Sequence, residues 1–496
     1  MVAHSVRSEM AVPNDEVWTA PVAELARRIR SRELSAVAVV DAFIERIEAV
    51  NPAINALIAD RFEAARADAE AAHQRIAAAT DPFALPPLLG VPFTCKEFIS
   101  AKGFSYTAGL VSRRDAVADR DATVVTRAKQ AGGIFFGVTN VPEGGMWMET
   151  YNYLFGRTHN PWDVRRTPGG SSGGEGALIG AGAIPWGLGG DVAGSIRIPA
   201  AFCGIAGHKP TGGVIPNTGQ WQPEGNELGT ILTTGPMARH ASDLRLLFDV
   251  LRGPDGIDPQ VSHRELPQWT AEDMSKVVVY PVEHNGAAKV KPVMRKAVRK
   301  VTAVLERRGA RVARFQSKRL RKAFSIWALA MSGAMAAEDA PSFAELLGDG
   351  EEISLVREMA RLMSGKGRIT VPALGLAVLD KLVTLVPERV SRRVPKASEL
   401  QAELEDVLGP NGVLLHPPYS SPAPRHNFAL LKPFDAMCTA VFNVIGFPVT
   451  QVPTGFDNRG LPVGVQVAAR RGNDYLTMAV AEVIEQELGG WFMPPL

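Results

Sequence analysis

The sequence predicts an α/β protein with an inserted helical cap, and three observations lead to this fold class. Apolar segments typical of buried strands alternate with amphipathic segments typical of helices over most of the chain. Residues 320–400 differ, because they are helical in pattern, rich in Met, Leu and Ala, and poor in strand signals. A chain of 496 residues with 46% hydrophobic content can bury a large core. Its length is compatible with three domains, but large single α/β domains are common.

The N-terminal part of the chain reads as a leader followed by helices. Residues 1–16 are predicted to be a flexible leader, without the apolar stretch of a signal peptide. The region 22–79 is predicted to be helical, because apolar residues recur mostly at three- and four-residue spacing. We expect Ser35 to cap one helix and Asn51-Pro52 to end it. The Ala-rich residues 61–79 predict a second long helix that faces solvent.

The region 88–255 is predicted to be the catalytic core, with helices and strands in alternation. Short buried strands are expected around Pro92 and over 132–141, with a helix over 121–132 before the second. A helix near 174–182, a strand near 184–190 and a turn at 191–195 repeat the pattern. Residues 239–253 predict a further helix.

The rest of the chain continues the alternation around the cap. A strand at 276–282 precedes an amphipathic helix at 290–312, and the helical cap insertion covers about 320–400. The closing region 413–496 begins with a strand and a Pro-rich loop over 413–426. A helix at 435–446, strands at 448–456 and 461–469, and a last helix ended by Gly489 complete it.

Charge and cysteine content exclude several classes of function. The formal net charge is +2 and no Lys/Arg run stands out, so no nucleic-acid partner is expected. The three cysteines are widely spaced, which predicts a reducing compartment without structural disulfides or a zinc site. No uninterrupted apolar run reaches the length of about 18 residues that a membrane span needs. A cytoplasmic location is the expectation.

Between residues 167 and 213, glycines cluster around Ser171, Ser172 and Ser195 in a segment too apolar for a surface linker. Buried glycines beside hydroxyl groups suggest a backbone drawn close around a reacting group. The GGSSG of 169–173 matches a nucleophile elbow, but polar residues and two prolines precede it instead of a buried strand. A phosphate loop is equally unexpected, because no G-K-[ST] follows. An ordinary Gly-Ser turn is as well supported by this motif alone.

The turn at 191–195 is the second candidate. Successive backbone N–H groups from Val192 to Ser195 could point inward and form an oxyanion hole. Asp191 and Arg197 flank the turn and could pair to brace it. On the turn alone, a strand end with glycines for close packing is slightly favoured.

Lys96 is the third candidate, since it lies on an apolar strand. A buried lysine is costly when charged and unpaired, and burial can lower its pKa toward neutrality, where it serves as a general base. A lysine that reaches water, or one that pairs with Glu97, is favoured on sequence alone.

Histidine is the usual partner of a nucleophilic serine, and the chain has nine. We expect His208 to bond the backbone, His159 to lie in a polar loop, and His416 and His426 to bracket a loop that could line a cleft. None has a convincing Asp companion, and no metal-ligand spacing occurs.

Taken together, these blocks resemble the amidase signature family over nearly the whole chain. GVPFTCKE (90–97), GGSSGG (169–174) and GGDVAGSIRIPAAFCGIAGHKPT (189–211) match its blocks in order and spacing. The segment GGEGALIG is similar to the corresponding segment of the fatty acid amide hydrolase branch. The resemblance implies one large domain over 17–496, with a mixed twisted central sheet flanked by helices on both faces.

The resemblance also implies a Ser–cisSer–Lys triad that hydrolyses a small-molecule amide with no cofactor and no metal. Ser195 aligns with the nucleophile, Ser171 with the bridging serine after a cis peptide, and Lys96 with the base. Ser172 aligns with a supporting residue, and the oxyanion-hole amides are those of Val192, Ala193, Gly194 and Ser195.

Two positions depart from the family pattern. Ala193 stands where the family usually has glycine, and we expect a backbone conformation that alanine tolerates. Leu110 stands where many members have serine, which puts the polarity of one pocket wall in doubt.

The sequence is compatible with three functions. An amidase is favoured over an amidotransferase subunit that releases ammonia for a tRNA-linked partner, because that subunit predicts a GSSGGSAAA-like helix. An inactive binding protein would be expected to have lost one of the triad residues. Hydrophobic or fatty acyl amides are candidate substrates.

The segment 374–396 combines an apolar face with a basic end. A cap helix packed on the core is favoured over a weak peripheral membrane contact, because amphipathic helices usually pack on a core. A homodimer is the remaining partner left open.

Overall fold

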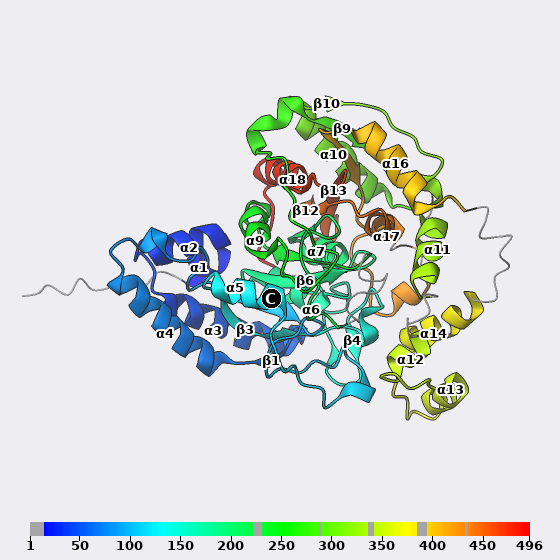
Figure 1. The fold of residues 1–496 in the computed structure, drawn as a ribbon, viewed down its shortest axis with the longest axis horizontal. Coiled ribbons are helices and arrows are strands. Elements are labelled where there is room, and N and C mark those ends of the chain that lie inside the picture. The colour runs from blue at the N-terminus through cyan, green and yellow to red at the C-terminus, as the bar shows by residue number, and fades with distance from the viewer. Residues whose placement is uncertain are drawn as a thin grey trace, which may run out of the picture.

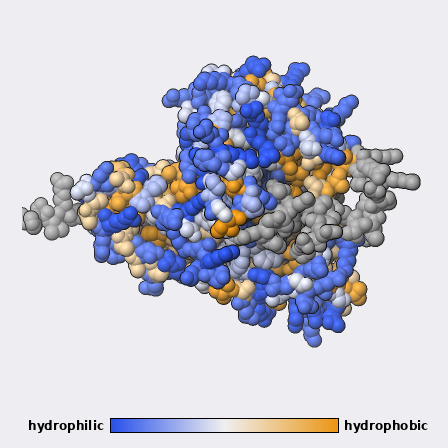
Figure 2. All heavy atoms as spheres, viewed as in Figure 1, coloured by the Kyte–Doolittle hydropathy of each residue, from blue (hydrophilic) through white to orange (hydrophobic). Residues whose placement is uncertain are grey.

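The computed structural model describes residues 14–221, 231–284, 286, 289–335, 342–383, 394–431, 435 and 437–496. It is an α/β structure built on one mixed sheet of eleven strands in the order β1-β3-β2-β6-β8-β7-β12-β13-β11-β9-β10. In Figure 1 the N-terminal helices lie at one end of this sheet, and β9 and β10 lie at the other. The face seen in Figure 2 is mostly hydrophilic, with apolar side chains in separate patches.

Strands follow the apolar segments of the sequence. They are β1 (Leu57–Asp60), β2 (Pro92–Lys96), β3 (Ile134–Thr139), β6 (Trp186–Asp191), β7 (Ala206–Lys209), β8 (Thr233–Ala238), β9 (Val278–Pro281), β10 (Arg311–Val312), β11 (Gly412–His416), β12 (Val449–Phe456) and β13 (Pro462–Ala469). A separate pair, β4 (Tyr151–Asn152) and β5 (Gly156–Arg157), is antiparallel. In the main sheet β3, β2 and β6 run parallel, as do β11, β9 and β10.

Helices precede or follow most of these strands. They are α1 (Asn14–Thr19), α2 (Val22–Arg30), α3 (Ala36–Ile54), α4 (Phe62–Ala78), α5 (Thr123–Gln130), α6 (Gly173–Gly180), α7 (Arg197–Cys203), α9 (Leu244–Leu251), α10 (Pro292–Arg307), α17 (Met437–Val444) and α18 (Asp474–Leu488). The cap region holds α11 (Ala323–Met335), α12 (Phe343–Leu347), α13 (Leu355–Met363), α14 (Val371–Val383) and α16 (Ala397–Leu408).

Helices cover both faces of the sheet, as the alternation of side chains along β11 shows. Val413 and Leu415 belong to the cluster that contains Ile484 of α18, whereas Leu414 belongs to the cluster with Leu404 of α16 and with α17. All of these side chains are buried. Strands buried on both faces read as continuous apolar runs, which is why the sequence shows them clearly.

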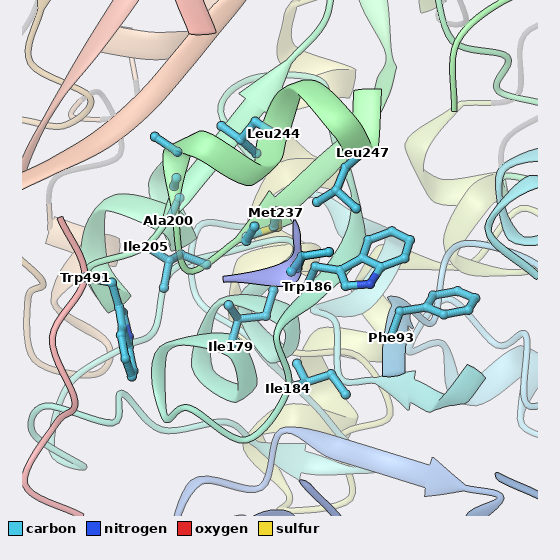
Figure 3. Packing of buried hydrophobic residues seen from close by; sticks show 14 of the residues in the cluster. Phe93, Ile179, Ile184, Trp186, Ala200, Ile205, Met237, Leu244, Leu247 and Trp491 are labelled. Atoms are coloured by element: carbon cyan, nitrogen blue, oxygen red, sulfur yellow. The ribbon is translucent and has the colours of Figure 1, made fainter. Parts of the chain in front are cut away.

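The largest core cluster lies over β2 and β6, beside the candidate site. Trp186 on β6 stacks on Phe93 of β2 with ring centroids 4.9 Å apart, and both side chains are fully buried. Figure 3 shows these two rings together, with Ile179 and Ile184 nearby. This packing fixes the two parallel strands whose carboxyl ends lie at the candidate site.

Several elements were not predicted from the sequence. β1 interrupts the region 22–79, α7 and β7 lie in the Gly-rich segment 167–213, and β8 follows that segment. The two-residue strands β4, β5 and β10 were not expected either. Gly or Pro within α7, β7 and β8 hides the periodicity that a longer element would show, and β1 has only four residues. The predicted leader of residues 1–16 also ends too late, because α1 begins at Asn14.

The predicted end of α3 at Asn51-Pro52 is wrong by a few residues. The helix includes Pro52 and ends at Ile54, followed by Asn55 in the left-handed conformation with φ 49°. The side chain of Asn51 accepts hydrogen bonds from the backbone N–H groups of Ala56 and Leu57 at 2.8 and 2.9 Å. These bonds organise the chain reversal into β1.

The described residues of the cap region form helices joined by turns and loops, with no strand among them. Phe343 and Leu374 of the cap pack in one cluster with Phe98, which follows β2. Residues 384–393 of the predicted 374–396 helix lie outside the described residues. No helix in the described ranges is long and apolar enough to cross a membrane.

We predict that Gly137→Ala destabilises the edge of the sheet by about 1–3 kcal/mol, the usual cost of overpacking. A Cβ at Gly137 would collide with the carbonyl oxygen of Ala59 on the neighbouring strand β1. Urea unfolding of the variant and the wild type measures the difference.

Gly375→Ala is the matched control for this prediction, since Gly375 lies exposed in α14 with no atom within 4 Å of an added Cβ. It should leave stability unchanged or raise it by up to about 1 kcal/mol. Equal stability of the two variants would contradict the predicted collision.

Candidate active site

Three predicted segments meet at one edge of the sheet. Lys96 is the last residue of β2, and Asp191 is the last residue of its parallel neighbour β6. The carboxyl ends of parallel strands lie at the same edge, where open α/β sheets bind their ligands. The loop that carries Ser171 and Ser172 precedes α6, which packs against both strands.

Lys96 and Ser171 form a direct hydrogen bond. The Lys96 Nζ donates to Ser171 Oγ at 2.9 Å, and each residue is only 3% exposed. A second, longer bond of 3.5 Å runs from Nζ to the carbonyl oxygen of Gly190. The ammonium also lies 4.9 Å from the ring centroid of Phe98. Lys96 therefore neither reaches water nor depends on Glu97, whose carboxylate accepts instead from Thr107 Oγ1 at 2.7 Å.

Burial is the main influence on the Lys96 side chain. It lowers the pKa of Lys96 from its usual value to about 7, and the negative charges of Asp191 and Glu175 oppose this shift only in part. A lysine with such a pKa is largely neutral above pH 7 and can accept a proton.

The Gly170–Ser171 peptide bond is cis. The glycines before Ser171 are needed for space, since a Cβ at Gly170 would lie 2.5 Å from the carbonyl oxygen of Trp147. A Cβ at Gly169 would lie 2.8 Å from the backbone of Pro199. The segment thus passes between two other pieces of backbone.

Ser172 ties this loop to the turn that contains Ser195. The backbone N–H of Ser172 donates to the carbonyl oxygen of Ser195 at 3.2 Å, and Ser172 Oγ donates to the carbonyl oxygen of Gly190 at 3.3 Å. Ser172 is fully buried and Ser195 is partly exposed. The structure therefore brings Lys96, Ser171, Ser172 and the Ser195 turn together.

A buried ion pair braces that turn. Asp191 and Arg197 are fully buried and joined by two contacts of 3.0 Å. The Asp191 carboxylate also accepts from the backbone N–H of Ile196 at 3.1 Å. Burial alone would raise the pKa of Asp191, but the Arg197 charge and these hydrogen bonds hold it below its usual range.

The backbone N–H groups of the turn are not equivalent. Gly194 N–H donates to Asp191 Oδ1 at 2.6 Å, so in this structure it is not directed at an oxyanion. The N–H groups of Val192, Ala193 and Ser195 have no acceptor among the described residues. The positive φ falls at Gly194, at 121°, and Ala193 adopts a conformation that alanine tolerates, as expected.

Sequence reasoning missed the residues that support the turn from α17 and β13. Asn443 donates to the carbonyl oxygen of Asp191 at 2.7 Å and accepts from Arg197 at 2.6 Å. Thr439 Oγ1 donates to the carbonyl oxygen of Ala193 at 2.6 Å, and Gln466 accepts from Arg197 at 3.1 Å. The available signal was weak: Asn443 is a polar residue within the apolar segment of a predicted helix.

The histidines occupy other places. The expectation that none has an Asp companion is wrong for His208, which lies 3.2 Å from Asp474, with its other ring nitrogen 2.9 Å from Thr450. Both nitrogens are thus used away from the serines. His416 is buried against its own loop, and His426 and His159 contact each other at 3.1 Å. The described residues contain no cluster of three or more metal-ligating side chains.

The fold and the site define an α/β hydrolytic enzyme in which a buried lysine, rather than a histidine, contacts a serine. Comparison with known proteins agrees: the model of the family described as Amidase matches residues 38–478. The chain belongs to the amidase signature family and is a hydrolase that acts on amides.

The chain is also similar to individual relatives and solved structures. It is 39% identical to the human fatty-acid amide hydrolase 2 over 95% of this chain and 89% of that protein. It is 31% identical to an acylamidase of Rhodococcus erythropolis over 93% and 94%. The solved structure of 6-aminohexanoate cyclic dimer hydrolase with substrate matches with TM-score 0.75 and 26% identity, over 95% of this chain and 98% of that one.

We predict that Arg197→Met lowers the free energy of unfolding by about 3–5 kcal/mol, because it leaves the Asp191 carboxylate buried without its ion-pair partner. Activity should fall with it, since the turn around Ser195 loses its brace. Urea unfolding and the rate of amide hydrolysis are the two measurements.

Arg165→Met is the matched control, because the Arg165 side chain pairs with Asp163 while 72% exposed. Its cost should stay below about 1 kcal/mol. A loss at Arg197 no larger than this would contradict the role given to the buried pair.

Proposed function

We propose that this enzyme hydrolyses a carboxylic amide to a carboxylate and ammonia or an amine through an acyl-enzyme on Ser195. The observation that supports it most directly is the 2.9 Å hydrogen bond between the buried Lys96 Nζ and Ser171 Oγ. Ser171 in turn lies next to Ser172, whose N–H is bonded to the Ser195 carbonyl.

The proton path follows from this arrangement. Neutral Lys96 accepts the hydroxyl proton of Ser171. Ser171 in turn takes the hydroxyl proton of Ser195 as the Ser195 Oγ attacks the amide carbon. The proton returns through Ser171 to the leaving nitrogen, so that the C–N bond breaks with expulsion of a neutral amine. Water then attacks the ester, and Ser195 regains its proton as the carboxylate leaves.

The tetrahedral intermediate needs donors for its oxygen anion. The N–H groups of Val192, Ala193 and Ser195 are the candidates, while Gly194 joins them only if it releases Asp191. Ser172 acts as a supporting residue through its bonds to the Gly190 and Ser195 carbonyls, and Asp191 and Arg197 hold the turn.

Hydrophobic or fatty acyl amides are the proposed substrates. The similarity to fatty-acid amide hydrolase 2 over 95% of the chain supports this choice. Leu110 also lies in the apolar cluster that joins Phe98 to the cap, so this wall is apolar where many members have serine. An amidotransferase role is less well supported, because the buried Glu175 follows the serine pair in place of the serine of a GSSGGSAAA-like helix.

A peripheral membrane contact through the cap is a second proposal, with the enzyme otherwise in the cytoplasm. Apolar side chains on α13 and α14 are exposed, at 74% for Val356, 90% for Met363 and 52% for Leu379. Other residues of α14, such as Leu374, pack on the core, so one helix has both kinds of contact. A homodimer stays a prediction that sedimentation velocity tests.

The pH profile tests the base. Because the pKa of Lys96 is lowered to about 7, kcat/KM should rise as pH increases through 7 and Lys96 loses its proton. Lys96→Met should cut activity by about 100-fold or more and flatten this acid limb. An unchanged profile would exclude Lys96 as the base.

The nucleophile and the substrate class are tested together with Ser195→Ala. Wild type and variant are compared on short aliphatic amides, aryl amides, long-chain primary amides and N-acyl ethanolamines. We expect the long-chain amides to have the highest kcat/KM and the variant to be inactive on all four classes. Hydrolysis that survives in the variant would refute the nucleophile.

Liposome co-sedimentation at low salt tests the membrane contact. The wild type should bind, and Val356→Glu/Met363→Glu should not, because charges replace exposed apolar side chains. Absence of wild-type binding to both neutral and anionic vesicles would end this proposal without affecting the amidase chemistry.

A further inference from the structure

Glu175 is a buried carboxyl group that the mechanism above does not use. It lies in the first turn of α6, three residues after Ser172, and its side chain is fully buried. Its Oε2 accepts from Thr94 Oγ1 at 2.8 Å and its Oε1 from Thr139 Oγ1 at 2.9 Å. Both oxygens are thus held by hydroxyl groups of two strands.

These two strands place the carboxyl group beside Lys96. Thr94 lies two positions before Lys96 on β2, so the two side chains share one face of the sheet. Thr139 is the partner of Lys96 in the parallel register of β2 and β3. The groups that hold Glu175 are therefore the nearest neighbours of Lys96 along and across the sheet.

The sheet leaves room for this carboxyl group. A Cβ at Gly187 on β6, which pairs with Thr94, would overlap the Glu175 carboxylate. A side chain at position 187 would therefore displace it. The glycine, the two threonines and the glutamate form one site in which a carboxyl group is enclosed.

Lys96 gains a positive charge each time it accepts the serine proton, and it does so in a dry layer. An ammonium ion in such a layer needs a counter-charge. The ionisable groups that influence it are Asp191 at the end of β6 and Glu175 on α6. Asp191 is already paired with Arg197 and accepts from the N–H groups of Gly194, Ile196 and Asn443. Its negative charge is therefore largely balanced by these partners.

We propose, on the basis of the proposed function, that Glu175 is a positioning residue that supplies the counter-charge for the Lys96 ammonium formed during acylation. It touches neither substrate nor the reacting atoms. It acts by stabilising the protonated form of the base, so that Lys96 is basic enough to draw the proton from Ser171.

The titration of the two groups supports this coupling. Burial raises the pKa of Glu175 to about 8, against the hydrogen bonds of Thr94 and Thr139 and the charge of Lys96. With the pKa of Lys96 at about 7, the two groups titrate in overlapping ranges and behave as a pair. Ionisation of Glu175 favours the charged lysine, and neutralising it favours the free amine.

Glu175→Gln keeps the shape of the side chain, and a threonine hydroxyl can turn to accept from the new amide. Without the negative charge Lys96 loses its proton more readily. The midpoint of the acid limb of kcat/KM should therefore move to lower pH, by less than one unit because Glu175 is only partly ionised near pH 7. At pH 9, where wild-type Glu175 is ionised, kcat should fall by about tenfold because Lys96 is a weaker base.

Glu97→Gln is the matched control, since Glu97 is a buried carboxyl group directly after Lys96 but contacts Thr107. Its acid limb should stay at the wild-type midpoint. A Glu175→Gln midpoint that is unchanged, or that moves to higher pH, overturns the proposal.

Thr139→Val provides the second variant, for the case that Glu175→Gln does not fold by circular dichroism. It removes one donor to the carboxylate, disfavours the anion, and should shift the midpoint in the same direction by a smaller amount. A wild-type midpoint here overturns the proposal as well. Ser195→Ala separates the two levels: if it is inactive while both midpoints are unchanged, only the role of Glu175 fails.

Discussion

The burial of Lys96 is the constraint on which the rest of the site depends. The Lys96 amine is 3% exposed and bonded to Ser171 at 2.9 Å, so water cannot stabilise its charged form. Its pKa is therefore lowered to about 7. This makes a histidine unnecessary, which agrees with His208 being occupied by Asp474 and Thr450. It also demands that the surrounding backbone approach closely, because open space would admit water. The glycines at 169, 170 and 187 meet that demand, since each lies against atoms that a side chain would displace.

Two buried carboxyl groups flank this amine and differ in what satisfies them. Asp191 is paired with Arg197 and accepts backbone N–H groups of its own turn, so its charge shapes the turn around Ser195. Among the described residues, the Glu175 carboxylate accepts from two neutral hydroxyl groups, so its charge state remains responsive to the proton on Lys96. The paired Asp191 carboxylate holds the geometry of the turn, whereas the proton occupancy of Glu175 can change as Lys96 gains and loses its proton. The difference lies in the partners, because both side chains are equally buried.

The sequence allowed the strands around Pro92 and Trp186, the cap helices and the grouping of Lys96 with the serines to be predicted, since long apolar runs and blocks of specific spacing are visible along the chain. It did not show β7 or β8, whose few residues include Gly or Pro, or β1, which is only four residues long and offers no period to read. Nor did it reveal Asn443, Thr439 and Gln466, because their partners are 200 or more positions away and depend on the folded path of the chain. The use of the Gly194 amide by Asp191 was equally hidden, since four successive N–H groups look alike until a carboxylate selects one.

The proposed mechanism separates chemistry from substrate choice in this fold. The reacting groups lie at the edge of a sheet whose strands are buried on both faces, and their neighbours are glycine backbones that tolerate no added atoms. The cap meets this edge through apolar side chains around Phe98, and its α13 and α14 also expose apolar residues. Substitutions in the cap can therefore alter which amide is admitted without disturbing the proton path, whereas substitutions at the sheet edge act on every substrate alike. Variation in substrate among enzymes of this fold is thus expected to concentrate in the cap.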